Sequence, residues 1–111
     1  MPNEHSVVFL RSAELDLKEL KSYVIMNFGK DAWQSSYSKI QEAVGTIQTF
    51  PLGGKIPEEL DKLDLTQYCQ VISVMNRIIY EVRQETIYIH IVCDIRKDMK
   101  SLLTKRLLRT I

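Results

Sequence analysis

Four basic side chains and one histidine in the last third of the chain could act on an anionic substrate. Arg77 begins an apolar, strand-like run, His90 lies in the middle of the next one, and Arg96, Lys97 and Lys100 follow directly after that. Cations of this kind stabilise charge that develops on a phosphate, and a histidine can move a proton near neutral pH. Because His90 has apolar neighbours, a structural histidine remains its favoured interpretation.

The net charge of +1 conceals an uneven distribution. Residues 1–75 hold seven Lys/Arg and ten Asp/Glu, which gives −3, and residues 76–111 hold eight and four, which gives +4. A basic C-terminal third predicts a local patch for an anionic partner, either nucleic acid or an acidic protein segment. A solvated helix face would produce the same pattern.

Other kinds of site find less support in the sequence. Cys69 and Cys93 form neither a CxxC pair nor a disulfide framework, and in apolar runs a free thiol packs as a small hydrophobe. Together with His5 and His90 they lack the spacing of metal ligands. Gly-Gly-Lys at 53–55 lacks the GxxxxGK[ST] pattern of a phosphate loop. We therefore expect no metal and no cofactor.

The totals describe one ordinary globular domain over residues 1–111. Hydrophobic residues make up 45% and charged residues 26%, which argues against disorder. No apolar stretch approaches the length needed to span a membrane. The apolar run near the start of the chain is also too short for a signal peptide. With free cysteines, this predicts a soluble, cytoplasmic protein that does not bind membranes.

The first half of the chain predicts a strand and a helical hairpin. Residues 6–10 are typical of a short strand, and Ser12 is the expected N-cap of a helix that ends at Gly29. Its apolar stripe consists of Leu17, Leu20, Val24 and Phe28. A second helix after Asp31 has the stripe Trp33, Tyr37, Ile40, Val44 and Ile47. Stripes at spacings of three and four indicate amphipathic helices that pack against a core.

The second half predicts three strands, after an irregular connection over residues 50–65. Runs rich in β-branched and aromatic residues occupy 68–75, 77–82 and 86–93, and links this short make the strands antiparallel neighbours. Strict alternation assigns Ile78, Tyr80 and Val82 to one face of the middle strand. In the last strand it directs Ile87, Ile89, Ile91 and Cys93 to the core, and Tyr88, His90 and Val92 to the opposite face. A short basic helix from Met99 onward should close the chain.

Four stretches of the sequence carry a family resemblance. In chain order they are AELDLKEL, FPLGGKIPEEL, YCQVISVMNRIIYEV and IYIHIVCDIRKDMKSLLTKRLLR. Together they resemble the RelE/ParE superfamily of toxins from bacterial type II toxin-antitoxin modules, from about Val7 to Arg109. The resemblance implies an α+β fold: an N-terminal strand, a helical hairpin packed on an antiparallel β-meander, and a short basic C-terminal helix. It also implies a cognate antitoxin that wraps around the toxin.

Two activities are known in this superfamily, and the resemblance bears on both. RelE-like members cleave mRNA on the ribosome, whereas ParE-like members inhibit DNA gyrase and stabilise plasmids or prophages. Arg77 matches the arginine at the start of the middle strand of the ribonucleases, and Arg96 and Lys97 match their basic position after the last strand. Cys69 and Gln70 stand where those enzymes have lysines, however, and the late Tyr or His is missing.

The resemblance therefore favours a ParE-like gyrase inhibitor, for which Arg77, Arg96, Lys97 and Lys100 would contact the target or the antitoxin. A ribosome-dependent mRNA interferase is the alternative, with Arg77, His90, Arg96 and Lys97 as its catalytic residues. A non-toxic nucleic-acid-binding module that uses the same basic helix is a second alternative. Whether the chain is an enzyme depends on this choice.

Overall fold

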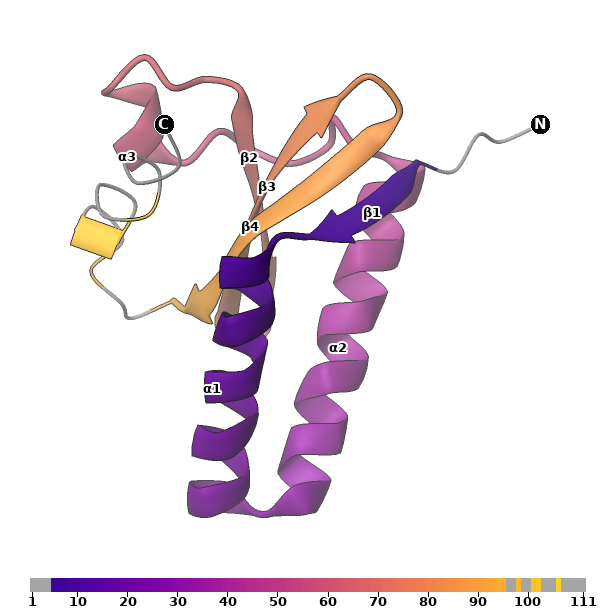
Figure 1. Cartoon of the computed structure of the whole chain (residues 1–111), viewed down its shortest axis with the longest axis vertical. Helices are drawn as coiled ribbons and strands as arrows, with labels where there is room; N and C mark the ends of the chain where they lie inside the picture. Colours follow the sequence, from indigo (N-terminus) through magenta and orange to yellow (C-terminus); the bar gives the residue numbers. More distant parts are fainter. Residues whose placement is uncertain (1–4, 96–97, 99–100, 103–105, 107–111) are drawn as a thin grey trace.

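The computed structural model describes residues 5–95, 98, 101, 102 and 106 (Figure 1). In chain order the elements are β1 (Ser6–Phe9), α1 (Arg11–Phe28), α2 (Lys30–Thr49), α3 (Glu58–Asp61), β2 (Tyr68–Ser73), β3 (Asn76–Arg83) and β4 (Thr86–Asp94). The class is α+β, as predicted, with a helical hairpin packed on a four-stranded sheet.

The sheet has the order β1-β4-β3-β2. The meander β2-β3-β4 is antiparallel, which confirms the arrangement predicted from its short links. β1 pairs with β4 in parallel, with Ser6 opposite Thr86 and Phe9 opposite Ile89. A parallel pair needs a long connection, and the helical hairpin and β2–β3 together supply it. The sheet is therefore mixed, with β1 and β2 at its two edges.

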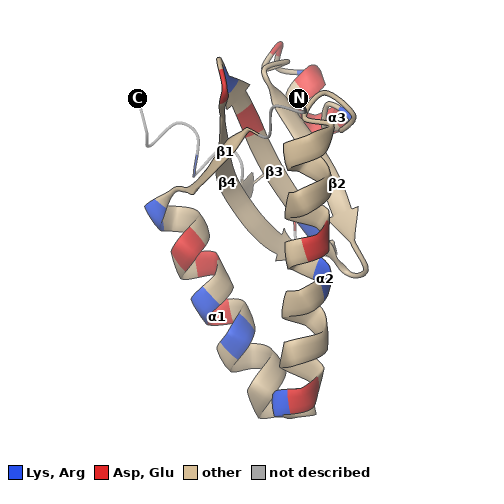
Figure 2. Cartoon of the chain, turned by 90° about the vertical axis from the view of Figure 1, so that its right-hand side faces the viewer, with Lys and Arg blue, Asp and Glu red and all other residues tan. Residues whose placement is uncertain are grey.

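The hairpin of α1 and α2 turns at Gly29, whose φ of 94° is a conformation that favours glycine. Its closed end projects beyond the sheet in both views, and both helices carry charges of either sign (Figure 2). The N-cap expected at Ser12 is wrong, because α1 already begins at Arg11. The Leu10 N–H bonds to Ile89 O in the sheet, and Leu10 O accepts the Glu14 N–H, so the chain passes directly from strand to helix.

β4 contains a bulge that was not predicted from the sequence. Ile79 lies opposite Ile91, but the next residue of β3, Tyr80, lies opposite Ile89. His90 is therefore an extra residue without a partner in β3. A bulge of this kind reverses the side-chain alternation of the strand beyond it.

The predicted faces are accordingly correct before His90 and wrong after it. Val92, expected on the face opposite the core, packs beneath the helices with Ile87 and Ile89. Ile91 and Cys93, expected beneath the helices, lie on the other face. The sheet thus has two apolar clusters. The larger cluster faces the hairpin and includes Ala13, Ile40, Ile47, Ile78 and Tyr80. The smaller cluster consists of Leu60, Tyr68, Ile79, Ile91 and Cys93.

The connection over residues 50–65 is irregular, as predicted, but it contains the single turn α3, and two contacts attach it to the sheet. The Tyr80 hydroxyl donates a hydrogen bond of 2.7 Å to Pro51 O, and Lys55 forms an antiparallel bridge with Gln70 of β2. Leu60 of α3 is fully buried in the smaller cluster. The connection is therefore attached along the β2 edge of the sheet, and its Leu60 contributes to the cluster on the face opposite the hairpin.

Most of the basic helix expected at the C-terminus, including Met99, lies outside the described residues. Ser101, Leu102 and Arg106 are helical, and Leu102 packs against the smaller cluster. Within the described part of the chain, no helix combines the length and the apolarity that crossing a bilayer requires.

Candidate functional site

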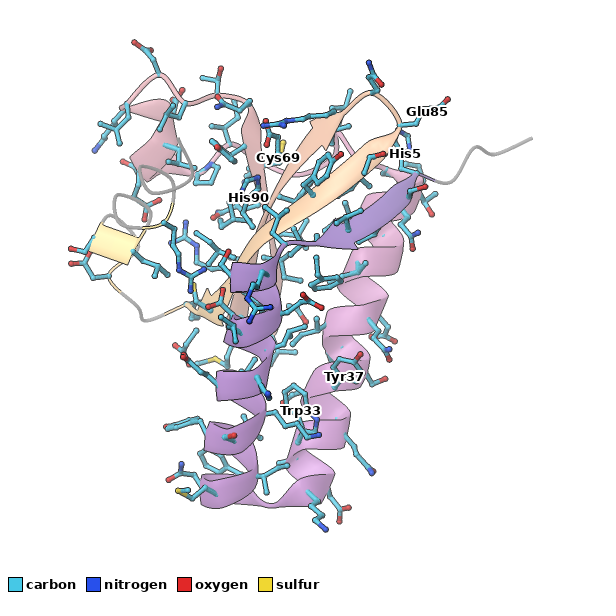
Figure 3. All side chains as sticks on the ribbon, in the orientation of Figure 1. His5, Trp33, Tyr37, Cys69, Glu85 and His90 are labelled. Carbon is cyan, nitrogen blue, oxygen red and sulfur yellow. The ribbon has the colours of Figure 1, made fainter. Side chains whose placement is uncertain are left out.

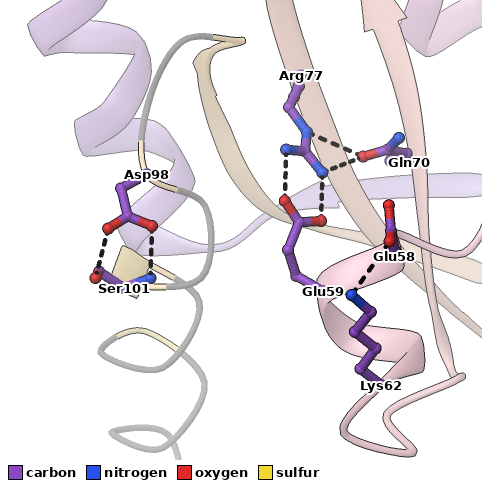
Figure 4. Close-up of polar contacts among 7 residues, drawn as sticks. All are labelled: Glu58, Glu59, Lys62, Gln70, Arg77, Asp98 and Ser101. Carbon is purple, nitrogen blue, oxygen red and sulfur yellow. Dashed lines mark hydrogen bonds and ion pairs between the residues drawn. The ribbon is translucent and has the colours of Figure 1, made fainter.

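Arg77, the arginine singled out from the sequence, is held in a closed polar network (Figure 4). Its Nη1 and Nη2 donate to the two carboxylate oxygens of Glu59 in α3, at 3.2 and 3.1 Å. Its Nε donates to Gln70 Oε1 at 3.0 Å, and Nη2 shares that acceptor. The side chain of Arg77 is only 12% exposed. Both edges of the guanidinium are thus occupied by groups of the same chain.

The Glu59 carboxylate holds the position that a phosphate would need at Arg77. A bidentate pair between a guanidinium and a carboxylate uses the same fork of donors that recognises a phosphate. The hydrogen bonds from Arg77 lower the pKa of Glu59 below its ordinary value of 4.5, so Glu59 is ionised near neutral pH. An anion could bind Arg77 only by displacing a carboxylate that is already well bound.

His90, which is labelled in Figure 3, belongs to a second polar group. Its Nε2 lies 3.0 Å from Glu81 Oε1, and the edge of its ring meets Tyr68 with centroids 5.1 Å apart. The second oxygen of Glu81 accepts from Arg83 Nε at 3.0 Å. Burial lowers the pKa of His90, and the hydrogen bond to Glu81 opposes that shift. A neutral His90 that donates to Glu81 is the state this environment favours.

Arg77 and His90 belong to separate polar groups. Arg77 lies opposite Cys93 of β4, three residues along that strand from His90. Each of the two candidates has a carboxylate partner of its own. The remaining candidates, Arg96, Lys97 and Lys100, lie outside the described residues.

A third polar site, absent from the sequence interpretation, joins α1 to the open side of β4. Asp16 is 8% exposed and accepts the Val92 N–H at 3.0 Å, beyond the point where β1 ends. Arg106 makes an ion pair with the same carboxylate. The pair borders a cavity of about 460 Å³ between α1 and β4. Because Ala13, Asp16 and Leu20 share one helix stripe, an aspartate in an apolar row was the signal that could have revealed the site.

The two cysteines are placed as small hydrophobes. Burial raises the pKa of the Cys93 thiol to about 11, and burial also raises the pKa of Cys69. The thiolate is the reactive form, so neither residue is a nucleophile near neutral pH. Across the described ranges, no three His, Cys, Asp or Glu side chains gather closely enough to ligate one metal ion.

The family model described as ParE toxin of type II toxin-antitoxin system, parDE, matches residues 7–99. A search of curated proteins found no match. Among solved structures, a chain of the chromosomal ParDE toxin-antitoxin system from P. aeruginosa is similar, with a TM-score of 0.68 and 16% identity, over 83% of this chain and 97% of that one. A chain of the RelBE2 toxin-antitoxin complex from Mycobacterium tuberculosis has a TM-score of 0.58 and 19% identity, over 82% and 98%.

Proposed function

Because this chain belongs to the family of ParE toxins of type II toxin-antitoxin systems, we propose that it arrests bacterial growth by inhibiting DNA gyrase. We propose further that a cognate antitoxin neutralises it and that it acts in the cytoplasm, where gyrase and the antitoxin are found. An inhibitor of this kind acts by binding and needs no set of proton-transfer groups of its own.

The observation that carries the choice of gyrase is the closed network at Arg77. Cleavage of RNA needs cations that stabilise charge on the phosphorane and a group that moves the 2′-hydroxyl proton. Arg77 is occupied by Glu59 and Gln70, and His90 is bound to Glu81 in a separate group. The two ribonuclease candidates that the structure describes are therefore each bound to a carboxylate of the same chain, whereas an inhibitor requires only a complementary surface.

The same network changes the expected roles of the basic residues. The charge of Arg77 is offset by Glu59 within the fold, so Arg77 contributes little to attraction of a distant anionic partner. Arg96, Lys97 and Lys100 remain the proposed contacts with gyrase or with the antitoxin. They follow β4 directly in the sequence and account for three of the eight cations in residues 76–111.

Two parallel assays on the purified chain test this proposal. One measures supercoiling by DNA gyrase and looks for trapped, cleaved DNA, and the other measures coupled translation and maps cuts in the mRNA. Trapped DNA with intact mRNA is the expected result. Ribosome-dependent cuts with normal supercoiling would refute the choice of gyrase.

A ribosome-dependent mRNA interferase is the second candidate, and one observation favours it. Glu81 orients His90 through Nε2, which is how a carboxylate prepares a histidine for general acid–base work. If the mRNA is cut, His90→Ala should abolish the cuts and Glu59→Gln should strengthen them by releasing Arg77. Salt-dependent binding to naked DNA or RNA without growth arrest would instead support the non-toxic nucleic-acid-binding module.

A further inference from the structure

The turn between β2 and β3 combines backbone strain with an apolar surface. Ser73 lies opposite Asn76, so Val74 and Met75 form a two-residue turn, and Val74 has a φ of 56°. Turns of this length usually place Gly, Asn or Asp at a positive φ. A β-branched residue is rare there, because its side chain crowds the backbone. The Val74 side chain is 68% exposed, so packing within the fold does not compensate for the strain.

The turn between β3 and β4 has the same length but different side chains. Arg83 lies opposite Thr86, and Gln84, at the first position of the turn, has the same φ of 56°. Gln84 and Glu85 are both polar and exposed. The backbone geometry of such a turn therefore does not require apolar side chains. A contact outside the fold would account for an exposed valine at a strained position in the other turn.

Two further apolar side chains extend the surface at the β2–β3 turn. Ile72 precedes the turn in β2, and Ile95 follows β4 and donates its N–H to Met75 O at 2.8 Å. The arrowhead of β4 in Figure 1 marks this end of the sheet. The turn patch, as we call it, consists of four exposed side chains: Ile72, Val74, Met75 and Ile95. An exposed apolar patch with polar residues at its margin is typical of a surface that binds another protein.

The sequence beside the turn patch indicates the charge of its partner. Arg96 and Lys97 follow Ile95 directly, and residues 94–100 hold three Lys/Arg against two Asp. A partner that covers the patch meets this positive charge, so we expect it to carry acidic side chains around an apolar site. A second copy of this chain fits less well, because it would bring the same cations together. Four side chains are also far fewer than the about 20–30 residues that each partner contributes to a stable interface.

We propose that the turn patch is the apolar part of the surface with which this chain binds DNA gyrase, next to the contacts proposed for Arg96 and Lys97. The occupant is an apolar site on gyrase that is bordered by carboxylates. Burial of Val74 and Met75 in that site supplies affinity, and the cations beside the patch speed association at low salt. This inference rests on the proposed function, because it takes gyrase as the target.

The test measures inhibition of gyrase supercoiling and the thermal midpoint for the full-length chain and four variants. Val74→Asn removes an apolar group and relieves the strain, because asparagine tolerates a positive φ. Gln84→Asn introduces the same residue at the other turn, as its control. Met75→Ser removes the second apolar side chain of the turn and retains the backbone bond to Ile95. Met26→Ser is the control for that change, because Met26 is exposed on α1, outside the patch.

We expect Val74→Asn to raise the thermal midpoint by about 4 °C and at the same time to weaken inhibition about tenfold. A gain in stability with a loss of activity identifies a residue that serves a contact outside the fold. Met75→Ser should weaken inhibition to a similar extent, with its midpoint nearly unchanged. Gln84→Asn and Met26→Ser should inhibit gyrase as the unmodified chain does.

Normal inhibition by both Val74→Asn and Met75→Ser would overturn the inference and leave the proposed function intact. So would variants that lose antitoxin binding but inhibit gyrase normally, which would make the antitoxin the occupant. A dimer of the free chain that either variant dissociates would make a second copy the occupant, with the same consequence. An unmodified chain that does not inhibit gyrase would overturn the proposed function and this inference together.

Discussion

Glu59 is the residue on which the state of Arg77 depends. Replacement by alanine leaves a guanidinium that is only 12% exposed with Gln70 as its remaining partner, and we expect the free energy of unfolding to fall by about 1–3 kcal/mol. Glu58→Ala is the matched control in the same turn, because Glu58 pairs with Lys62 at the surface and should contribute little. Urea denaturation of both variants measures the difference. Equal effects would mean that the Arg77 network is not structural.

The same pair should make stability depend on pH in acid. Arg77 lowers the pKa of Glu59 below its ordinary value of 4.5, so the folded state binds this proton less readily than the unfolded state. The stabilisation is therefore complete above that value and is lost as the pH falls through the folded pKa. Unfolding of the wild type and of Glu59→Gln should be compared from about pH 7 to pH 3. The variant should lack this component, and parallel curves would contradict the assignment.

Asp16 holds two separate groups with one carboxylate. Asp16→Ala leaves the Val92 N–H and Arg106 without their acceptor, and we expect a loss of about 2–4 kcal/mol in the free energy of unfolding. Asp16→Asn can still accept from Val92 and should lose less. Glu19→Ala, an exposed position on the same helix that also borders the cavity, is the control. Equal stability of all three variants would refute a structural role for the carboxylate.

Within the elements, two glycines should respond in opposite directions to the same change. A Cβ at Gly54 would collide with the Tyr80 hydroxyl and lie 2.8 Å from Gln70 O, so Gly54→Ala must displace the connection from the sheet. We expect it to destabilise the fold by about 1–3 kcal/mol. A Cβ at Gly45, inside α2, meets nothing within 4 Å, and Gly45→Ala should stabilise by about 0.5–1 kcal/mol. Thermal or urea midpoints of the two variants test the pair, and a stabilising Gly54→Ala would contradict the packing described.

The sequence predicts the elements well because each depends on a local pattern. The stripe of α2 and the stop at Gly29 identify the hairpin, and the short links fix the antiparallel order of the meander. The bulge at His90 could not be predicted, since an extra residue in a strand is defined only by the register of its neighbour. For the same reason the side chains of Ile91, Val92 and Cys93 were assigned to the wrong faces.

The polar sites were harder to predict than the elements. Arg77 and His90 were identified by residue type, but their carboxylate partners come from positions 59 and 81. Glu59 is 18 residues away in sequence, in a connection without a repeating pattern. Asp16 and Arg106 are 90 residues apart, and only the tertiary fold brings them together. Pairing at such distances leaves no periodic signal in one sequence.

For the molecule as a whole, we expect toxicity to depend on the positive charges of Arg96 and Lys97 and not on a change in the stability of the fold. Expression of the chain alone in bacteria should arrest growth, and co-expression of the antitoxin encoded beside it should relieve the arrest. Reversal of charge in the double variant Arg96→Glu and Lys97→Glu should abolish toxicity and leave the thermal midpoint nearly unchanged. Harmless overproduction of the folded wild type would refute the toxin function, and a large loss of stability in the variant would make the two residues structural.

The parallel pairing of β1 with β4 also determines when the chain can complete its sheet during translation. Ser6 pairs with Thr86, so β1, the first strand to leave the ribosome, has no strand partner until β4, the last, has been synthesised. At about 5–20 residues per second, the 80 residues from Val7 to Thr86 take about 4–16 s to translate. Until then α1 and α2 have no complete sheet to pack against. A chain whose translation stops before Thr86 cannot close the fold and is open to proteolysis, so incomplete products of this gene carry no folded toxin.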